Sequence, residues 1–197
     1  MPMPEPDEPT DATRLFYAVL PDADARERLS TLALEAAGRT GGRAARPDTL
    51  HLTLVFVGTL PASRVGEAIG AAGAIAWQRC QLDIDRLGAF VRAGVAWAGP
   101  TGIVESLAAG QRALIAALAQ CGIDTDPRPW RPHVTLARGC VRPLAGRIDP
   151  PITWEVDRVV LMGSRLARDG PRYREIASWP TEPPGSPAGD SASALRT

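Results

Sequence analysis

The amino-acid sequence predicts an α+β fold built mainly on antiparallel sheet. Segments rich in β-forming residues alternate with segments at helical spacing, in the order strand, helix, strand, helix, two strands, helix and three strands. Neither Gly-rich phosphate-binding signature, G-x-G-x-x-G or the P-loop, is present. One short motif occurs twice, near a half-chain repeat, which suggests two similar lobes that each supply one copy.

Each element of the first half has a local cause. Helical spacing of apolar residues predicts a helix over 22–37, which begins at the capping residue Asp22 and ends at Gly38. A weaker, Ala-rich helix is expected over 61–77, and the Gly- and Arg-rich stretch 40–47 is expected to be a loop. Short apolar, β-forming runs predict strands over 14–20, which Pro21 closes, over 50–57, which Gly58 stops, and over 82–87 and 94–98.

The second half predicts one long helix and three strands. The helix spans 102–120 and is ended by Gly122, and a Pro- and Arg-rich loop follows over 124–132. Strands are expected over 133–137, 154–162 and 173–179. The expected organisation is a flexible acidic tail over 1–12, a single bilobal domain over 13–180 and a disordered, Pro- and Ser-rich tail over 181–197.

Composition predicts a cytoplasmic protein with no membrane association. The chain has 197 residues, of which 45% are hydrophobic and 22% charged, enough to build a core. No apolar run reaches the roughly 18 residues of a membrane span, and the N-terminal segment lacks the basic and apolar regions of a secretory signal. Cys80, Cys121 and Cys140 form no C-x-x-C pair, which argues against a disulfide framework or a zinc knuckle.

All 22 basic residues are arginine. A GC-rich genome explains this composition for the chain as a whole. Selection of arginine for forked phosphate contacts is an alternative only where arginines gather. They do so over 126–147, which holds five arginines against one acidic residue.

The two histidines of the chain carry the same motif. His51 begins H-L-T-L and His133 begins H-V-T-L, 82 residues further on. Residues i and i+2 of a strand share a face, so each histidine shares a face with the threonine that follows, Thr53 or Thr135. The aliphatic residues between them point the other way, into a core.

Two such strands facing across a cleft would bring two imidazoles and two hydroxyls around one small volume. An unperturbed imidazole has a pKa of roughly 6.5, so one can act as a base while the other acts as an acid. That pair suits in-line displacement at phosphorus, with the hydroxyls on the non-bridging oxygens. Ordinary strand histidines are one alternative. A metal site is another, but two histidines without a nearby Cys, Asp or Glu at ligand spacing supply too few ligands.

At these motifs the chain resembles the 2H phosphoesterase superfamily, and within it the bacterial and archaeal RNA 2′,3′-cyclic phosphodiesterases, historically labelled 2′-5′ RNA ligases. The resemblance covers about 14–180. It includes R-L-F-Y-A-V near the start, L-H-L-T-L-V-F-V-G and R-P-H-V-T-L-A-R at the two motifs, and S-R-L-A-R-D-G-P-R-Y-R-E-I near the end. It implies two pseudo-symmetric lobes, each with an antiparallel sheet and flanking helices, and an active-site cleft between them.

The resemblance also implies an activity that needs no metal or other cofactor, the opening of a 2′,3′-cyclic phosphate to a 2′-phosphate. It makes His51 and His133 catalytic, with His51 favoured as the acid, although the two near-identical motifs do not order the pair by themselves. It makes Thr53 and Thr135 phosphate ligands. The other substrate-binding residues that it implies are Arg138, Phe16 and Tyr173.

These further residues each have a second interpretation. Arg138 lies at an odd offset from His133, so it reaches the cleft only at the end of the strand or past a bulge. Core packing is the alternative for Phe16 and for Tyr173. Arg131, beside the second motif, is expected in a solvated loop, with a phosphate contact as the alternative.

The expected partners are RNA ends or small nucleotides that bear a 2′,3′-cyclic phosphate, and a monomer is expected. Two other functions stay open. The same histidines would serve an ATP-independent 2′-5′ RNA ligase that joins a cyclic phosphate to a 5′-hydroxyl. A non-catalytic module that binds RNA ends is the alternative of another class, and the presence of both histidines argues against it.

Overall fold

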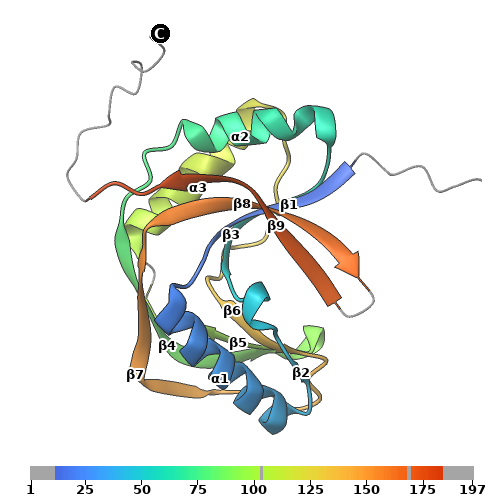
Figure 1. Ribbon diagram of the computed structural model, residues 1–197, viewed down its shortest axis with the longest axis vertical. Coiled ribbons are helices and arrows are strands. Elements are labelled where there is room, and N and C mark those ends of the chain that lie inside the picture. The colour runs from blue at the N-terminus through green and yellow to red at the C-terminus, as the bar shows by residue number, and fades with distance from the viewer. Residues whose placement is uncertain (1–11, 103, 168–169, 184–197) are drawn as a thin grey trace, which may run out of the picture.

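The computed structural model describes residues 12–102, 104–167 and 170–183 (Figure 1). The predicted N-terminal tail over 1–12, apart from Ala12 at its end, and residues 184–197 of the predicted C-terminal tail lie outside the described residues. The described part holds three α-helices, which are α1 (Ala23–Thr40), α2 (Val65–Gly73) and α3 (Glu105–Gln120). Three short 3₁₀ turns are η1 (Pro47–Thr49), η2 (Ala62–Arg64) and η3 (Val91–Ala93).

The strands of the described residues form one antiparallel sheet, which confirms the predicted α+β class. They are β1 (Ala12–Val19), β2 (Arg43–Ala44), β3 (Leu52–Pro61), β4 (Cys80–Phe90), β5 (Val95–Gly99), β6 (Val134–Arg138), β7 (Gly146–Val156), β8 (Arg158–Ala167) and β9 (Gly170–Pro180). Their order is β7-β4-β5-β6-β3-β1-β8-β9, and β2 pairs with β6 off this path.

The middle of this sheet is its narrowest connection. Leu52 of β3 pairs with Val134 of β6, and in the described part of the chain this single pair joins the two strands. On one side of the pair lie β6, β5, β4 and β7, and on the other lie β3, β1, β8 and β9. The family resemblance implied one sheet in each of two lobes. In the structure the half with β3 has four strands, the half with β6 has five including β2, and the two halves form one continuous sheet through this pair.

The first helix follows its predicted caps at one end only. The Asp22 side chain accepts a hydrogen bond from the backbone N–H of Ala25 at 2.8 Å, as a capping residue should. The helix does not end at Gly38 as predicted. It continues to Gly41, whose φ of 72° is the left-handed conformation that glycine adopts without strain. A glycine inside a helix was therefore mistaken for its cap.

The largest difference from prediction lies in the segment 146–167. The alternating and then apolar run 154–162 predicted one strand, but the chain changes strands at Asp157. Residues before it belong to β7 at one end of the sheet, and residues after it belong to β8 in the other half. The early part of β7 contains Pro150 and Pro151, which an edge strand tolerates and which concealed it in the sequence.

Smaller differences have similar causes. β3 does not stop at Gly58, because Leu15 pairs with Gly58 and Phe16 with Phe56, so the strand continues through a bulge. The second predicted helix is shorter than 61–77. Thr181, assigned to the C-terminal tail, is buried and donates its hydroxyl to the Val156 carbonyl at 2.8 Å.

The core lies mainly on one face of the sheet. Alternate residues of β1 show this division, because Leu15, Tyr17 and Val19 belong to the large cluster that contains residues of all three helices. Phe16 and Ala18 face the other way and pack with Val160 and Met162 in a smaller cluster. No helix of the described residues has the length and apolarity that a membrane span requires.

Candidate active site

The two histidines stand at the junction of the two half-sheets. Each directly precedes a strand, His51 before β3 and His133 before β6. Because Leu52 pairs with Val134 in antiparallel order, stepping one residue in each direction sets Thr53 against His133 and His51 against Thr135. The junction therefore brings together two imidazoles and two hydroxyls in crossed order.

The aliphatic residues between them are buried, as the strand period predicts. Leu52, Leu54, Val134 and Leu136 are each at most 2% exposed and belong to the main core. The histidines and threonines are half-buried and lie on the other face. Each motif thus anchors its strand with one face and presents its polar groups with the other.

Both imidazoles are held in the same way. Nδ1 of His51 donates to the Thr49 carbonyl at 2.7 Å, and Nδ1 of His133 donates to the Arg131 carbonyl at 2.6 Å. A carbonyl only accepts, so in each ring Nδ1 carries the hydrogen. Nε2 of each ring is left for chemistry, and the two rings are fixed in matching tautomers.

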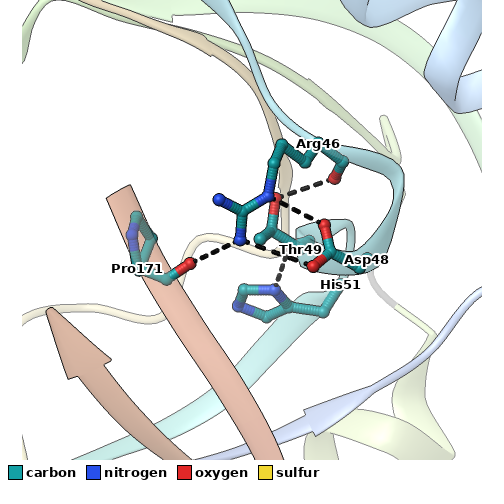
Figure 2. A network of polar contacts seen from close by, with 5 residues as sticks. All are labelled: Arg46, Asp48, Thr49, His51 and Pro171. Atoms are coloured by element: carbon teal, nitrogen blue, oxygen red, sulfur yellow. Dashed lines mark hydrogen bonds and ion pairs between the residues drawn. The ribbon is translucent and has the colours of Figure 1, made fainter. Parts of the chain in front are cut away.

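A second layer of contacts fixes the loop before His51 (Figure 2). The Arg46 guanidinium donates to the Asp48 carboxylate at 3.0 Å and to the Pro171 carbonyl of β9 at 2.9 Å. The Thr49 hydroxyl donates to the Arg46 carbonyl at 2.8 Å. The carbonyl that orients His51 is thereby tied to β9, at the far end of the same half-sheet.

Aromatic rings pack around His51. The Phe16 ring centroid lies 4.8 Å from that of His51, and the Tyr173 ring lies 5.3 Å away and nearly perpendicular. Phe16 is 2% exposed and packs in the smaller cluster, as the core-packing alternative expected, and its ring also lies against the imidazole. Tyr173 is half-buried beside it.

His133 has an aromatic environment of its own, which the sequence analysis missed. Phe90 lies 4.9 Å from it, nearly perpendicular, and Trp97 lies 6.3 Å from it. Gly88 makes room for Trp97, because a Cβ at Gly88 would come within 2.1 Å of the indole. The only signal in the sequence was a glycine inside a strand, which often marks such a close approach.

Burial lowers the pKa of both imidazoles. Desolvation is the largest cause in each case, and all contributions together bring the pKa of His51 to about 4. The Arg138 cation lowers both values further, and His133 also lowers that of His51. The hydrogen bonds to Thr49 and Arg131 act in the opposite direction.

β6 has both of the features that would let Arg138 approach the cleft despite its odd offset, a bulge and a strand end at that residue. Ala96 pairs with Ala137 and Trp97 with Thr135, so Leu136 is an extra residue in β6 and forms a bulge. Arg138, which pairs with Val95, is also the last residue of the strand. Since residues 95 and 97 share a face, the bulge puts Arg138 on the face of Thr135.

Other arginines also surround this centre. Arg138, Arg14 and Arg46 all act electrostatically on the Tyr173 hydroxyl, lowering a pKa that burial raises. Arg131 is exposed, and its carbonyl accepts the hydrogen bond from His133. The centre is cationic and suits an anion. In the described residues, no group of three or more His, Cys, Asp or Glu could hold a metal ion.

A cavity of about 640 Å³ adjoins the centre on the His133 side. His133 and Thr53 belong both to its lining and to the centre. The remaining lining is largely aromatic and aliphatic, with arginines and one carboxylate among it, and includes Phe56, Phe90, Val91, Ile115, Trp130 and Arg128. The hollow is therefore continuous with the place where a reacting group would lie.

Comparison with known proteins agrees with this geometry. The family described as the 2′-5′ RNA ligase superfamily matches residues 20–167. The chain is 30% identical over 177 residues to the RNA 2′,3′-cyclic phosphodiesterase of Escherichia coli (strain K12), covering 86% of this chain and 97% of that protein. It is 28% identical to the protein of the same name from Thermus thermophilus, covering 84% and 89%. Its fold matches E. coli LigT complexed with 3′-AMP with a TM-score of 0.79, at 27% identity over 86% of this chain and 98% of that chain.

Proposed function

Because the chain belongs to the 2′-5′ RNA ligase superfamily, we propose that it hydrolyses RNA 2′,3′-cyclic phosphodiester ends to 2′-phosphomonoester ends. The observation that carries this proposal is the crossed arrangement at the strand junction. Two imidazoles of the same tautomer, each with Nε2 available, stand beside two hydroxyls and one arginine. The two imidazoles can remove one proton and deliver another at a phosphate, which is what hydrolysis of the cyclic phosphate requires.

The product determines how the two protons move. The phosphate stays on the 2′ oxygen, so the 3′ oxygen must leave. Neutral His133 accepts a proton from water as that water attacks phosphorus in line with the 3′ oxygen. Protonated His51 gives its proton to the departing 3′ oxygen. Each transfer is typically worth about 10²- to 10⁴-fold in rate.

His51, the proposed acid, must be protonated to act, although the free enzyme favours its neutral form near pH 7. Burial lowers the pKa of His51 to about 4, and the charges of Arg138 and His133 contribute to the lowering. A bound phosphodiester anion offsets this repulsion and raises the pKa of the imidazole beside it. Substrate binding and protonation of His51 are therefore coupled.

The remaining groups act on the phosphate and on the rings. The hydroxyls of Thr53 and Thr135 and the guanidinium of Arg138 bind the non-bridging oxygens, whose charge grows in the transition state. Phe16 and Tyr173 hold the plane of the His51 ring, with centroids 4.8 and 5.3 Å away. The Tyr173 hydroxyl, in the field of three arginines, is a further contact for the substrate.

The direct test is product analysis with an RNA oligonucleotide that ends in a 2′,3′-cyclic phosphate, with excess chelator present. The expected product is the 2′-phosphate at an undiminished rate. Loss of activity with chelator and recovery with a divalent ion would overturn the two-histidine mechanism. A 5′-hydroxyl oligonucleotide in the same mixture separates the activities, because a 2′-5′-joined product in place of the hydrolysed end would show a ligase.

The proposed substrates are RNA ends and small nucleotides with the same cyclic phosphate. One chain supplies both halves of the site, so a monomer is sufficient for activity. Cys80, Cys121 and Cys140 are free thiols, which suits the reducing cytoplasm.

A further inference from the structure

The outer end of the β8–β9 hairpin carries three arginines on one face of the sheet. Gly163 of β8 pairs with Leu15 of β1, whose side chain faces the main core, so Gly163 and Arg165 lie on the core face. Across the hairpin, Arg165 pairs with Arg172. Gly163 pairs with Arg174. The three arginines are therefore on the face opposite to the catalytic one.

The main core ends before it reaches these arginines. Ile176, Ala177 and Trp179, farther along β9, pack against the main core, whereas the three arginines are exposed. Figure 1 shows the β8–β9 hairpin extending away from α2 and α3. The same face of the hairpin is thus apolar where the core covers it and cationic toward its end.

A hollow of about 310 Å³ lies among these arginines and is called the arginine hollow below. Its lining consists of Thr13, Gly163, Arg165, Arg172, Tyr173 and Arg174. A Cβ at Gly163 would come within 3.0 Å of the Ile176 side chain and 3.2 Å of the Thr13 side chain. A larger residue at Gly163 would therefore crowd the floor of the hollow. As it stands, the hollow has room for a phosphate group between arginines.

The arginine hollow brings like charges together. Arg165 and Arg172 are directly opposite each other on neighbouring strands, where like charges destabilise a sheet. Arg174 is the diagonal neighbour of Arg165 on the same face, which is within reach of a long side chain. The Glu175 carboxylate lies on the other face and bonds to Arg158 at 3.3 Å. An anion in the hollow would offset the repulsion between the arginines.

One residue connects the arginine hollow with the reaction centre. Tyr173 stands between Arg172 and Arg174 in β9, and its ring lies 5.3 Å from that of His51. It also belongs to the lining of the hollow. β9 is the outermost strand at this end of the sheet, so a flexible chain can pass round its edge from one face to the other. An RNA whose cyclic phosphate lies between the histidines can therefore bring an earlier phosphodiester to the hollow.

We propose that the arginine hollow binds a backbone phosphodiester of the RNA strand that precedes the cyclic phosphate, an inference that rests on the proposed function. Guanidinium groups bind phosphate oxygens through forked, charge-assisted hydrogen bonds. Such a contact adds affinity without reading the sequence of the RNA. A single nucleotide has no preceding phosphodiester. The hollow therefore makes RNA ends better substrates than small cyclic nucleotides.

The test compares a decameric RNA that ends in a 2′,3′-cyclic phosphate with adenosine 2′,3′-cyclic phosphate. Both are assayed with the wild type and with the double variant Arg165→Gln/Arg174→Gln. Loss of charge-assisted hydrogen bonds to one phosphate predicts a KM for the RNA that is higher by about tenfold, with kcat little changed. Both constants for the mononucleotide should stay at their wild-type values.

Arg39→Gln/Arg112→Gln is the matched control, because it removes the same charge from exposed arginines of α1 and α3, outside the hollow. It should change neither substrate. The hollow variant should melt no lower than the wild type, because it removes a contact between like charges. Equal losses with both substrates would overturn the proposal. No loss with the RNA, or the same loss in the control, would also overturn it.

Fluorescence anisotropy with a decameric RNA that ends in a 2′-phosphate separates this inference from the proposed function, because it measures binding without turnover. The slope of log Kd against log salt should be smaller in the hollow variant by about 0.7, the value for one phosphate contact on a single strand. If the wild type opens no cyclic phosphate, the proposed function is wrong, but weaker RNA binding by the hollow variant than by its control would still support the site. Unchanged RNA binding would overturn it. Loss of binding to inorganic phosphate alone would also overturn it, by indicating a site for a free anion.

Discussion

Leu52 of β3 and Val134 of β6 pair across antiparallel strands, and each directly follows a histidine. Both side chains are fully buried in the main core. The catalytic geometry that we propose is therefore anchored by an apolar contact, while the polar groups on the opposite face are left half-buried. This explains how two motifs 82 residues apart can act on one phosphate.

Arg138→Ala should lower activity with little effect on folding. Arg138 is exposed at the end of β6 and acts electrostatically on both histidines, so its loss removes charge stabilisation at the phosphate and not core packing. We expect at least a tenfold loss in kcat/KM and a melting temperature within a few degrees of the wild type. Arg131→Ala is the control, and full activity in Arg138→Ala with loss in Arg131→Ala would show that the wrong arginine was assigned.

The pH dependence should reflect the lowered pKa values. The reaction needs one charged and one neutral imidazole, and both pKa values lie below the usual 6.5 in the free enzyme, that of His51 at about 4. The competent form is therefore most populated on the acidic side of pH 6.5, and kcat/KM should fall as pH rises above it. The bound phosphate anion raises the pKa of both imidazoles, so the pH profile of kcat should lie at higher pH than that of kcat/KM. A kcat/KM that climbs steadily to pH 9 would contradict a protonated histidine donor.

Gly88→Ala should damage the His133 side of the site. An added Cβ would approach the Trp97 indole to 2.1 Å, so the ring must move from its place beside His133. Overpacking of this kind costs about 1–3 kcal/mol, and we expect a lower melting temperature together with lower kcat.

Gly66→Ala is the control for that change. Gly66 lies in α2 with no heavy atom within 4 Å of an added Cβ, and replacing a helical glycine by alanine is expected to add about 0.5–1 kcal/mol. Equal melting temperatures for the two variants would show that the indole does not depend on Gly88.

Periodicity was sufficient to predict which residues share a face. The H-x-T-L spacing predicted that His51 and Thr53 point away from Leu52, and the burial of the three residues agrees. Periodicity did not predict the bulges at Leu136 of β6 and at Leu54 of β3, where Tyr17 pairs with Val55 and Ala18 with Thr53. Both extra residues are apolar strand formers like their neighbours. From the sequence, Arg138 was therefore predicted to reach the cleft only if β6 ended there or contained a bulge.

Contacts between residues of strands that are distant in the sequence could not be predicted from the local sequence pattern. Phe90 and Trp97 border His133 only because β4, β5 and β6 are neighbours in the sheet. The division of 146–167 into two strands was missed for a related reason. Nothing local marks Asp157 as a boundary, and the chain turns there because the next strand pairs in the other half-sheet.

The central claim is that His51 and His133 act as one unit on a single phosphate. The most direct measurement is kcat for hydrolysis of a 2′,3′-cyclic phosphate by His51→Ala, His133→Ala and the double variant, with melting temperatures recorded for each. Each single change should cost at least about 10²-fold. The double variant should be far less impaired than the product of the two losses, because groups that act together are not additive. Folding should be preserved, since both imidazoles lie on the face away from the main core. Hydrolysis at the normal rate by either single variant would contradict the account.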